Sequence, residues 1–185
     1  MRRAPFSSVG ELLASLRCVE HQASEDVVPP LPHLLQTAAA LGETHGEDPE
    51  LVAAGLVHDV ASALDPQCGD HARAGAELVG PLLGWRVASL VAGHTDAKRY
   101  LVTVEAGYAG TLSPNSTATL VRQGGPMTAQ EVDVFRARPD WGAMVALRRA
   151  DDGAKVPGRV VPALATWRCL LTGLADAATV HTGLR

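Results

Sequence analysis

The chain has 185 residues, of which 46% are hydrophobic and only 4% aromatic, and its formal net charge is −4. This length suits one domain that can bury a hydrophobic core, and a mild negative charge without any basic run argues against a nucleic-acid-binding protein. Much of the apolar content is Ala, Leu and Val. Because Ala and Leu favour helices, the composition predicts a helical protein. No stretch approaches the ~18 uninterrupted apolar residues of a membrane span, so no membrane association is expected.

Signals for helices follow one another along the whole chain. Ser8 opens the pattern of a capping box, and Asp48 and Asp70 can each cap the helix that follows. Gly42 and Gly84 are the expected helix ends. In chain order, the predicted helices cover residues 8–20, 31–41, 50–63, 71–83, 85–102, 141–154 and 163–177, with two short helices on either side of the turn 123–127.

The remaining segments read as loops, and none has the alternation of a strand. Loops are expected over residues 21–32, 65–70 and 108–115, and the last eight residues read as a frayed tail. The sequence therefore predicts an all-α helical bundle in one domain spanning 1–185, with its core over about 31–177 and an N-terminal helix over 8–20.

The cysteines and the N-terminus indicate the compartment. An odd number of cysteines without CxxC spacing argues against a disulfide framework and against a thiolate zinc site. The chain begins Met-Arg-Arg, but Glu11 follows soon and no long apolar run appears, so no signal peptide is expected. These features predict a cytoplasmic protein with the reduced thiols Cys18, Cys68 and Cys169.

Four histidines lie in or at the edge of segments that are otherwise apolar. A buried histidine must satisfy two ring nitrogens, and a single one is more often a core residue bonded to a backbone carbonyl. Four in one chain need partners, which favours metal binding. These four are His33, His58, His71 and His94; the other three, His21, His45 and His181, have polar surroundings and are expected to face solvent.

The adjacent pair His58-Asp59 is the most informative. Neighbours on a helix point about 100° apart, so each side chain could face one side of a shared metal position. Imidazole and carboxylate without thiolate suit Fe, Mn or Zn rather than a structural zinc site. With Asp151 or Asp152 further along, the order H…HD…H…H…D supplies six ligands, enough for two metals with open positions and with Asp59 as a bridge.

Two basic residues are in register with these candidate ligands. Lys98 lies one helical turn after His94, and Arg148 lies three residues before Asp151, so each can point toward the same site. An arginine can bind two oxygens of an anion at once, and a lysine supplies a point charge. The alternative for both is a solvated surface charge. For Ser116 the alternative is a hydroxyl that caps a helix or bonds within a loop.

The ordered ligands resemble those of the HD-domain superfamily, and four downstream segments narrow the resemblance. They resemble, in the same order, the PhnZ-like subgroup of mixed-valent diiron oxygenases, which cleave carbon–phosphorus bonds in 1-hydroxyphosphonates and are distantly related to myo-inositol oxygenase. The resemblance runs from about residue 31 to residue 155, two-thirds of the chain. The segments are HTDAKRYL at 94–101, LSPNS at 112–116, QGGPM at 123–127 and ALRRADDGAK at 146–155.

This resemblance implies an HD-domain helical bundle with two iron ions, Fe(II) and Fe(III). The six implied ligands are His33, His58, Asp59, His71, His94 and Asp151. Asp151 is preferred to Asp152 because the ligand of the family stands four residues before the lysine matched by Lys155. The residues implied to hold the phosphonate are Lys98, Ser116, Arg148 and, as a lesser candidate, Gln123.

The implied reaction uses dioxygen as co-substrate and yields a carboxylic acid and phosphate. The expected partner is a small phosphonate such as 2-amino-1-hydroxyethylphosphonate, and the expected state is a monomer or weak dimer. One alternative is an HD-type metal-dependent phosphohydrolase, which would use a metal-bound hydroxide; another is a diiron oxygenase with a different polar substrate. A third is a non-catalytic binding protein, although six retained buried polar ligands argue against it.

The chain departs from the family pattern at two places. The family motif His-Asp-Ile-Gly-His reads HDVAS here, with Ser62 in place of the second histidine, and the loop between Asp59 and His71 is short. Relatives often carry a tyrosine and a glutamate before the first ligand; residues 23–26 contain no tyrosine, and Asp26 stands where the glutamate would be. Ser62 and Asp26 are therefore candidates for gating or for supporting the ligands, and an altered substrate is expected.

Overall fold

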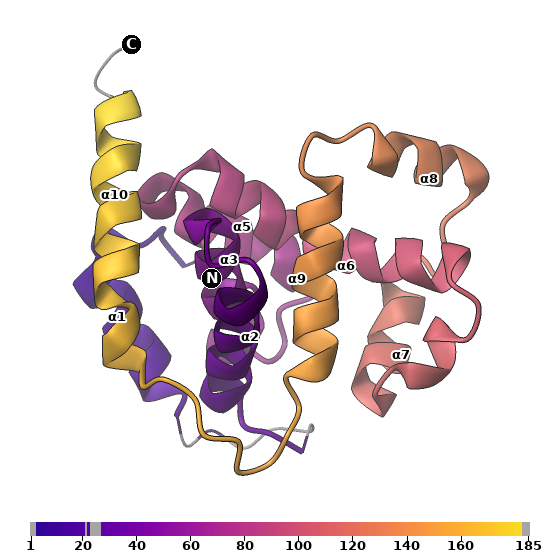
Figure 1. Ribbon diagram of the computed structural model, residues 1–185, viewed down its shortest axis with the longest axis horizontal. Coiled ribbons are helices and arrows are strands. Elements are labelled where there is room, and N and C mark those ends of the chain that lie inside the picture. The colour runs from indigo at the N-terminus through magenta and orange to yellow at the C-terminus, as the bar shows by residue number, and fades with distance from the viewer. Residues whose placement is uncertain (1–2, 21, 23–26, 183–185) are drawn as a thin grey trace.

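The computed structural model describes residues 3–20, 22 and 27–182, with side chains to residue 180. Within these residues the chain forms helices and contains no strand, which confirms the predicted all-α fold (Figure 1). No described helix is both long and apolar enough to cross a membrane. In chain order the α-helices, and the two short 3-10 helices η1 and η2, are α1 (Val9–Cys18), α2 (Pro30–Thr44), α3 (Pro49–Val57), α4 (Val60–Leu64), α5 (His71–Leu83), α6 (Trp85–Val104), η1 (Tyr108–Thr111), α7 (Pro114–Arg122), α8 (Ala129–Arg136), α9 (Trp141–Gly153), η2 (Leu164–Trp167) and α10 (Arg168–Thr182).

Short polar side chains start many of these helices. In each case a side-chain oxygen accepts a hydrogen bond from the backbone N–H three residues later, which satisfies a donor that the first turn cannot use. The caps predicted at Ser8, Asp48 and Asp70 are confirmed, and Ser113 and Thr128 cap α7 and α8 in the same way.

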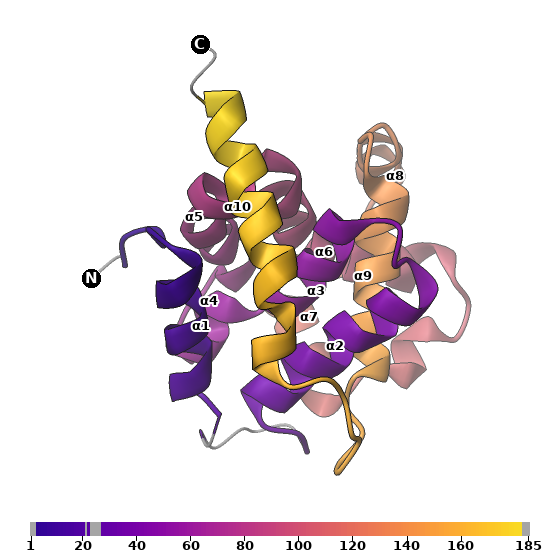
Figure 2. The same cartoon turned by 60° about the vertical axis from the view of Figure 1, so that its left-hand side comes forward.

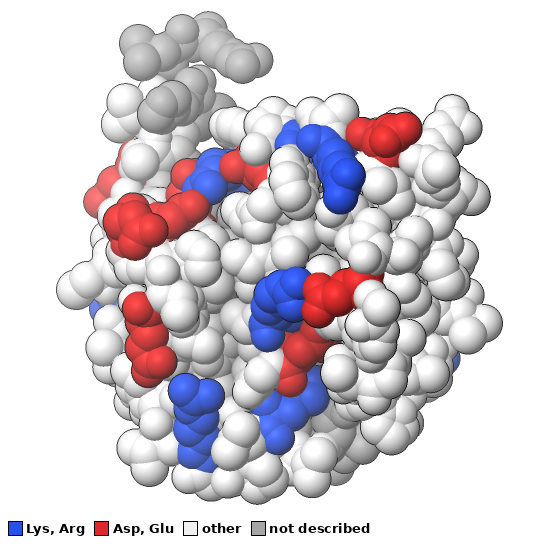
Figure 3. Space-filling model, turned by 45° about the vertical axis from the view of Figure 1, so that its right-hand side comes forward, with Lys and Arg blue, Asp and Glu red and all other residues white. Residues whose placement is uncertain are grey.

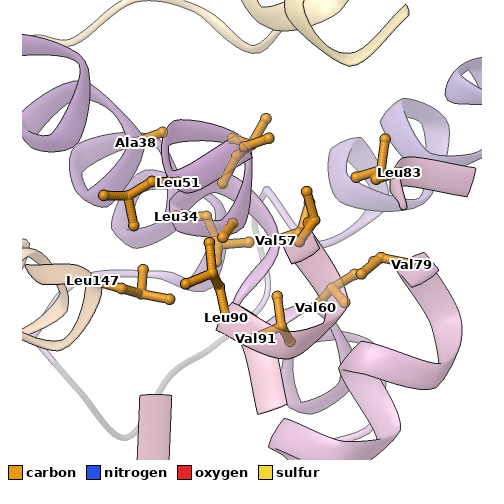
Figure 4. Packing of buried hydrophobic residues seen from close by; sticks show 14 of the residues in the cluster. Leu34, Ala38, Leu51, Val57, Val60, Val79, Leu83, Leu90, Val91 and Leu147 are labelled. Atoms are coloured by element: carbon orange, nitrogen blue, oxygen red, sulfur yellow. The ribbon is translucent and has the colours of Figure 1, made fainter. Parts of the chain in front are cut away.

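The hydrophobic core lies where α6 meets its neighbours. Helix α6 packs against α5, α3 and α9, while α2 packs against α3 and α9. Figure 4 shows side chains from these helices directed toward one another, among them Leu34, Val57, Leu90 and Leu147, each fully buried. Helix α10 lies along the outside, against α5, α3 and α1 (Figure 2). This arrangement holds α2, α3, α5, α6 and α9 around one centre.

Three predicted boundaries are wrong. Helix α2 continues through Gly42 to Thr44, because Gly42 does not adopt the positive φ by which a glycine ends a helix. Helix α10 continues to Thr182, so residues 178–182 are helical rather than a frayed tail. The expected loop 108–115 contains η1 and the first turn of α7.

The predicted helix 50–63 is also wrong, because it breaks at its centre. Helix α3 ends at Val57 and α4 begins at Val60, so His58 and Asp59 lie in a turn, and Asp59 has φ −107° and ψ 19°. The Ser62 hydroxyl donates to the Asp59 carbonyl at 3.0 Å. The expectation that these neighbours point about 100° apart on one helix therefore gives way to a turn that carries both side chains.

Helices α7 and α8 extend from the distal half of α6, on the right of Figure 1. The turn between them is held to α6 by Arg99, which donates to the Gly125 carbonyl at 2.8 Å and to the Glu131 carboxylate at 2.6 Å. Gly124 and Gly125 have φ of +100° and +71°, which glycine adopts without strain. The turn that carries Gln123 is thus fixed beside α6.

Candidate metal centre

The six predicted ligands converge on one place inside the bundle. They come from five segments that are distant in sequence: α2, the α3–α4 turn, the first residue of α5, the middle of α6 and the end of α9. The side chains are His33, His58, Asp59, His71, His94 and Asp151.

These side chains form two groups that share Asp59. In each group the potential ligand atoms all lie within 4.8 Å of one another, first in His33, His58 and Asp59, then in Asp59, His71 and His94. Asp151 extends the first group, with its Oδ1 3.2 Å from His33 Nε2 and 3.8 Å from His58 Nε2. The geometry supports the predicted bridging position of Asp59.

Backbone carbonyls orient three of the four imidazoles. The Nδ1 atom of His33 lies 2.9 Å from the Ala154 carbonyl, that of His58 lies 2.9 Å from Gly55 O, and that of His94 lies 2.6 Å from Val91 O. A carbonyl only accepts, so in each pair Nδ1 carries the proton. The other ring nitrogen, Nε2, then faces the centre, which is the arrangement of a metal-binding histidine.

Two buried atoms at the centre test whether a metal pair fits. Among the described residues, His58 Nε2 and Asp59 Oδ1 are buried and make no hydrogen bond. Burying such atoms without a partner costs free energy, and a cation between them would satisfy both. The Nε2 atoms of His71 and His94 also face each other at 3.3 Å. This donor set of imidazoles and carboxylates fits Fe, Mn or Zn.

The charges of the ligand groups also favour cation binding. Burial raises the pKa of Asp59 and Asp151, but His58 acting on Asp59 and Arg148 acting on Asp151 outweigh it, so both pKa values lie well below the usual range. Burial lowers the pKa of His58, yet Asp59 and Asp151 raise it to about 9. Burial also lowers the pKa of His71. Ionised carboxylates in the interior are ready to receive a cation.

Two basic side chains lie beside the ligands and are buried rather than solvated. Lys98 is 2% exposed and donates to the Ser116 carbonyl at 3.2 Å and to Thr119 Oγ1 at 2.8 Å. Arg148 is 3% exposed and donates to Asp151 Oδ2 at 2.8 Å and to Ser116 Oγ at 3.3 Å. The alternative of surface charges is therefore wrong, and both cations meet at Ser116.

The two cations disfavour each other in the absence of an anion. Burial lowers the pKa of Lys98, Arg148 lowers it further, and together they bring it to about 8 although Asp151 and Asp59 act in the opposite direction. A doubly charged anion bound beside both groups would relieve this repulsion. The arrangement therefore suits a phosphonate or phosphate group.

Gln123 lies at an opening beside the second ligand group. It lines a pocket together with His71, Thr95, Asp96 and Arg99. Its Oε1 atom is buried and has no hydrogen-bond partner among the described residues. Figure 3 shows acidic and basic side chains next to one another on the face turned to the viewer, with no large area of one sign. The pocket gives a polar approach to the ligand groups, with Gln123 at its edge.

The other candidates are less central. Ser62 is half-buried and bonds to the backbone of the α3–α4 turn, so it braces that turn. Asp26 and His21 lie outside the described residues, as does the side chain of His181. His45 bonds to the Thr44 hydroxyl at 2.8 Å and belongs to neither ligand group. The three cysteines are free thiols, as predicted.

Sequence reasoning missed two residues that hold Arg148. Its Nε atom lies 3.1 Å from the Tyr108 hydroxyl, and Asp152 accepts from both Nε and Nη2. The sequence offers Asp152 only as an alternative ligand to Asp151, and its spacing of four residues from Arg148 is the signal for this pair. Tyr108 stood in a stretch that was expected to be a loop, and its sequence context carried no signal of this contact.

Comparison with known proteins agrees with this geometry. Residues 33–137 match the HD domain family. The chain is 37% identical over 174 residues to the hydroxymethylphosphonate dioxygenase of Gimesia maris, covering 89% of this chain and 86% of that protein. It is 33% identical over 132 residues to the glycine-betaine-forming [1-hydroxy-2-(trimethylamino)ethyl]phosphonate dioxygenase of Leisingera caerulea, covering 66% of this chain and 67% of that protein.

Proposed function

This chain belongs to the HD-domain family, and we propose that it is an oxygenase that uses dioxygen to cleave the carbon–phosphorus bond of a small 1-hydroxyphosphonate. The products would be a carboxylic acid and phosphate. The observation that carries the proposal is the position of two buried cations, Lys98 and Arg148, beside paired ligand groups that share Asp59. Two relatives are named as dioxygenases of hydroxyphosphonates.

We propose that the ligand groups hold two iron ions, Fe(II) and Fe(III). His33, His58 and Asp151 would bind one ion, His71 and His94 the other, and Asp59 both. Iron in this donor set would supply the redox chemistry with dioxygen. The protein would hold the ions in place. Hydrogen bonds to backbone carbonyls orient the imidazoles, and the ionised carboxylates offset the positive charge of the ions.

The phosphonate would be held by the residues that meet at Ser116. Arg148 can donate through the one Nη1 hydrogen that no described contact uses, Lys98 adds a point charge, and Ser116 adds a hydroxyl. Gln123, at the pocket edge, would approach the substrate from the side of His71. Since Arg148 also donates to the proposed ligand Asp151, the anion and the metals would be held in one hydrogen-bonded unit.

The requirement for dioxygen tests this proposal against its main rival, a metal-dependent phosphohydrolase. Purified protein loaded with iron should release phosphate from hydroxymethylphosphonate in air and release none under nitrogen. Equal release under nitrogen would refute the oxygenase and support a hydrolase acting through metal-bound hydroxide. Measuring metal content together with a spectroscopic signature of the iron, before and after substrate, tests the two-iron assignment.

The substrate substituent is the second question, because Ser62 replaces a histidine of the family motif. The two named relatives act on phosphonates that differ in this substituent. Comparing kcat/KM for hydroxymethylphosphonate and 2-amino-1-hydroxyethylphosphonate, in the unaltered protein and in Ser62→His, would identify the preferred class. A change in the preference caused by Ser62→His would assign specificity to this position; the same preference in both proteins would count against it.

A further inference from the structure

The guanidinium of Arg148 is held by more contacts than phosphonate binding alone requires. Nη1 donates to Asp151 Oδ2 at 2.8 Å, and Nη2 donates to Ser116 Oγ at 3.3 Å. Asp152 accepts from two nitrogens, from Nε at 3.2 Å and from Nη2 at short range. Nε also donates to the Tyr108 hydroxyl at 3.1 Å. Three protein elements, α9, α7 and η1, therefore determine where this side chain lies.

Tyr108 closes this set of contacts. It is 6% exposed, and its hydroxyl donates to Asp152 Oδ2 while accepting from Arg148. Burial raises the pKa of Tyr108, so the phenol keeps the proton that it donates. Each of Tyr108, Asp152 and Arg148 thus bonds to the other two. Neither Tyr108 nor Asp152 belongs to the metal-ligand groups.

We infer that Tyr108 and Asp152 are positioning residues, which fix the plane of the Arg148 guanidinium for recognition of the phosphonate. The inference rests on the proposed function, in which Arg148 binds that group. An arginine side chain has many rotamers, and holding it in one plane before the ligand arrives reduces the entropy lost on binding. That plane also decides where the one Nη1 hydrogen that no described contact uses is directed.

The hydrogen bonds around Arg148 leave donors for the ligand. Nη1 carries two hydrogens, and one described contact, to Asp151, uses one of them. Ser116 Oγ accepts from Nη2, and no described contact takes the hydrogen of its own hydroxyl. An N–H of Arg148 and the O–H of Ser116 are therefore available side by side. If the guanidinium rotated, Nη2 would no longer lie against Ser116 and the two donors would separate.

Tyr108→Phe tests the inference with the least disturbance, because it removes one hydroxyl and keeps the ring. Tyr100→Phe is the matched control: Tyr100 is 5% exposed and its hydroxyl also accepts from an arginine, Arg136 Nε, at 2.9 Å, but it bonds to no residue of the proposed site. Asp152→Asn is less clean, because it removes a negative charge beside Arg148 and so changes the attraction for any anion.

The probe is methylphosphonate, which lacks the hydroxyl that the reaction requires. Calorimetric titration of the iron-loaded protein without dioxygen should give a Kd about tenfold higher for Tyr108→Phe than for the unaltered protein, and an unchanged Kd for Tyr100→Phe. With hydroxymethylphosphonate in air, KM should rise by a similar factor while kcat stays within about threefold. Thermal melts should show comparable Tm changes for both variants.

The outcomes separate this inference from the proposed function. Equal Kd values for all three proteins, with a lowered Tm in Tyr108→Phe, would overturn the inference and give Tyr108 a purely structural role. A raised Kd in Tyr108→Phe with no dioxygen-dependent phosphate release by the unaltered protein would overturn the proposed reaction and uphold the positioning role. Failure of the unaltered protein to bind methylphosphonate would overturn both.

Discussion

Asp59 stands alone among the proposed ligands in belonging to both groups, and this has a measurable consequence. Asp59→Asn should lower the metal content from about two ions per chain to below about one, because a neutral amide weakens both sites. His71→Ala should leave about one ion, because the first group does not contain His71. Elemental analysis of the purified variants measures this.

An exposed carboxylate provides the control for that series. Asp65 is exposed and bonds to the backbone N–H of Gln67, away from both groups, so Asp65→Asn should keep the metal content of the unaltered protein. Retention of both ions by Asp59→Asn would contradict the shared position of Asp59.

Lys98 makes anion binding depend on pH. Burial and the neighbouring Arg148 bring its pKa to about 8, so its positive charge is present below that pH and is lost as pH rises through it. Methylphosphonate affinity should therefore fall above pH 8, relative to Lys98→Met measured at each pH. The ratio of the two Kd values removes the titration of the phosphonate itself, and a ratio that does not change from pH 6.5 to about 9.5 would exclude this role for Lys98.

Much of the candidate site could be predicted at this scale, because its residue types carry the chemistry. Histidines in apolar surroundings and the adjacent His58-Asp59 indicated metal binding before any contact was known, and the structure brings all six proposed ligands together. The support of Arg148 could not be predicted. Tyr108 lies 40 residues from Arg148 in sequence, and only the fold, which packs η1 against α6, makes them neighbours.

The sequence predicts most of the helices but not the break between α3 and α4. The apolar pattern continues through residues 50–63, so periodicity alone favours a single helix. The break between α3 and α4 accompanies contacts that sequence does not reveal: the His58 ring bonds to the Gly55 carbonyl, and the Ser62 hydroxyl bonds to the Asp59 carbonyl. The boundary therefore follows the demands of the site rather than local propensity.

Gly55 shows how tightly α3 must approach α2 for this turn to form. A Cβ atom at this position would lie 2.7 Å from Leu41 Cδ1 and 3.3 Å from the Ala38 Cα atom, which belongs to the backbone of α2. Gly55→Ala should lower the free energy of unfolding by about 1–3 kcal/mol, because α2 and α3 must separate. It should also reduce metal content, since the Gly55 carbonyl orients His58.

A second helical glycine provides the matched control for Gly55→Ala. A Cβ at Gly142 in α9 would meet nothing within 4 Å. Gly142→Ala should therefore raise the free energy of unfolding by up to about 1 kcal/mol through helix propensity, with unchanged metal content. Urea denaturation of both variants, with and without bound metal, measures the change in the free energy of unfolding. Equal changes in Gly55→Ala and Gly142→Ala would show that the close α2–α3 contact does not constrain residue 55.

Across the whole molecule, Arg86 ties together the starts of three helices. From the first turn of α6 it reaches Asp48, the N-cap of α3, at 2.7 Å, Glu50 at 3.0 Å and Asp140, which precedes α9, at 2.9 Å. The side chain is 21% exposed, so water screens these pairs only in part. The cluster shares no residue with the metal-ligand set but joins helices that carry it.

Arg86→Met should lower the free energy of unfolding by about 1–3 kcal/mol at neutral pH, because it leaves three carboxylates facing one another. Arg73→Met is the control: Arg73 is exposed and pairs with Glu77 on the same helix, so its loss should change stability by less than about 0.5 kcal/mol. Thermal melts compare the two variants. Equal losses of stability in the two variants would show that the ion pairs of Arg86 contribute no more than one exposed ion pair.

The contribution of Arg86 should also depend on pH in a defined direction. Its hydrogen bond holds the pKa of Asp48 below the ordinary 3.8, so the stability from this pair is present above that pH and is lost as pH falls through the lowered value. The difference in Tm between the unaltered protein and Arg86→Met should shrink in acid.

The single domain remains a prediction, supported by α10, which returns to pack on α5 and α3. The proposed ligands all come from one chain, which fits the expected monomer or weak dimer, and light scattering of the purified protein would measure this. Helix caps and apolar periodicity do not reveal the number of domains or the oligomeric state, because both depend on which apolar faces pack together.

Because the proposed ligands are far apart along the chain, bound metal would cross-link distant segments. The six side chains span residues 33 to 151, so the ions would act as cross-links that close long loops between α2 and α9. Helices α1 and α10 lie outside this closed portion and contribute no proposed ligand (Figure 2). We therefore expect bound metal to slow proteolysis within residues 33–151 far more than in α1 and α10. A protease should remove these terminal helices while the segment between the ligands stays intact.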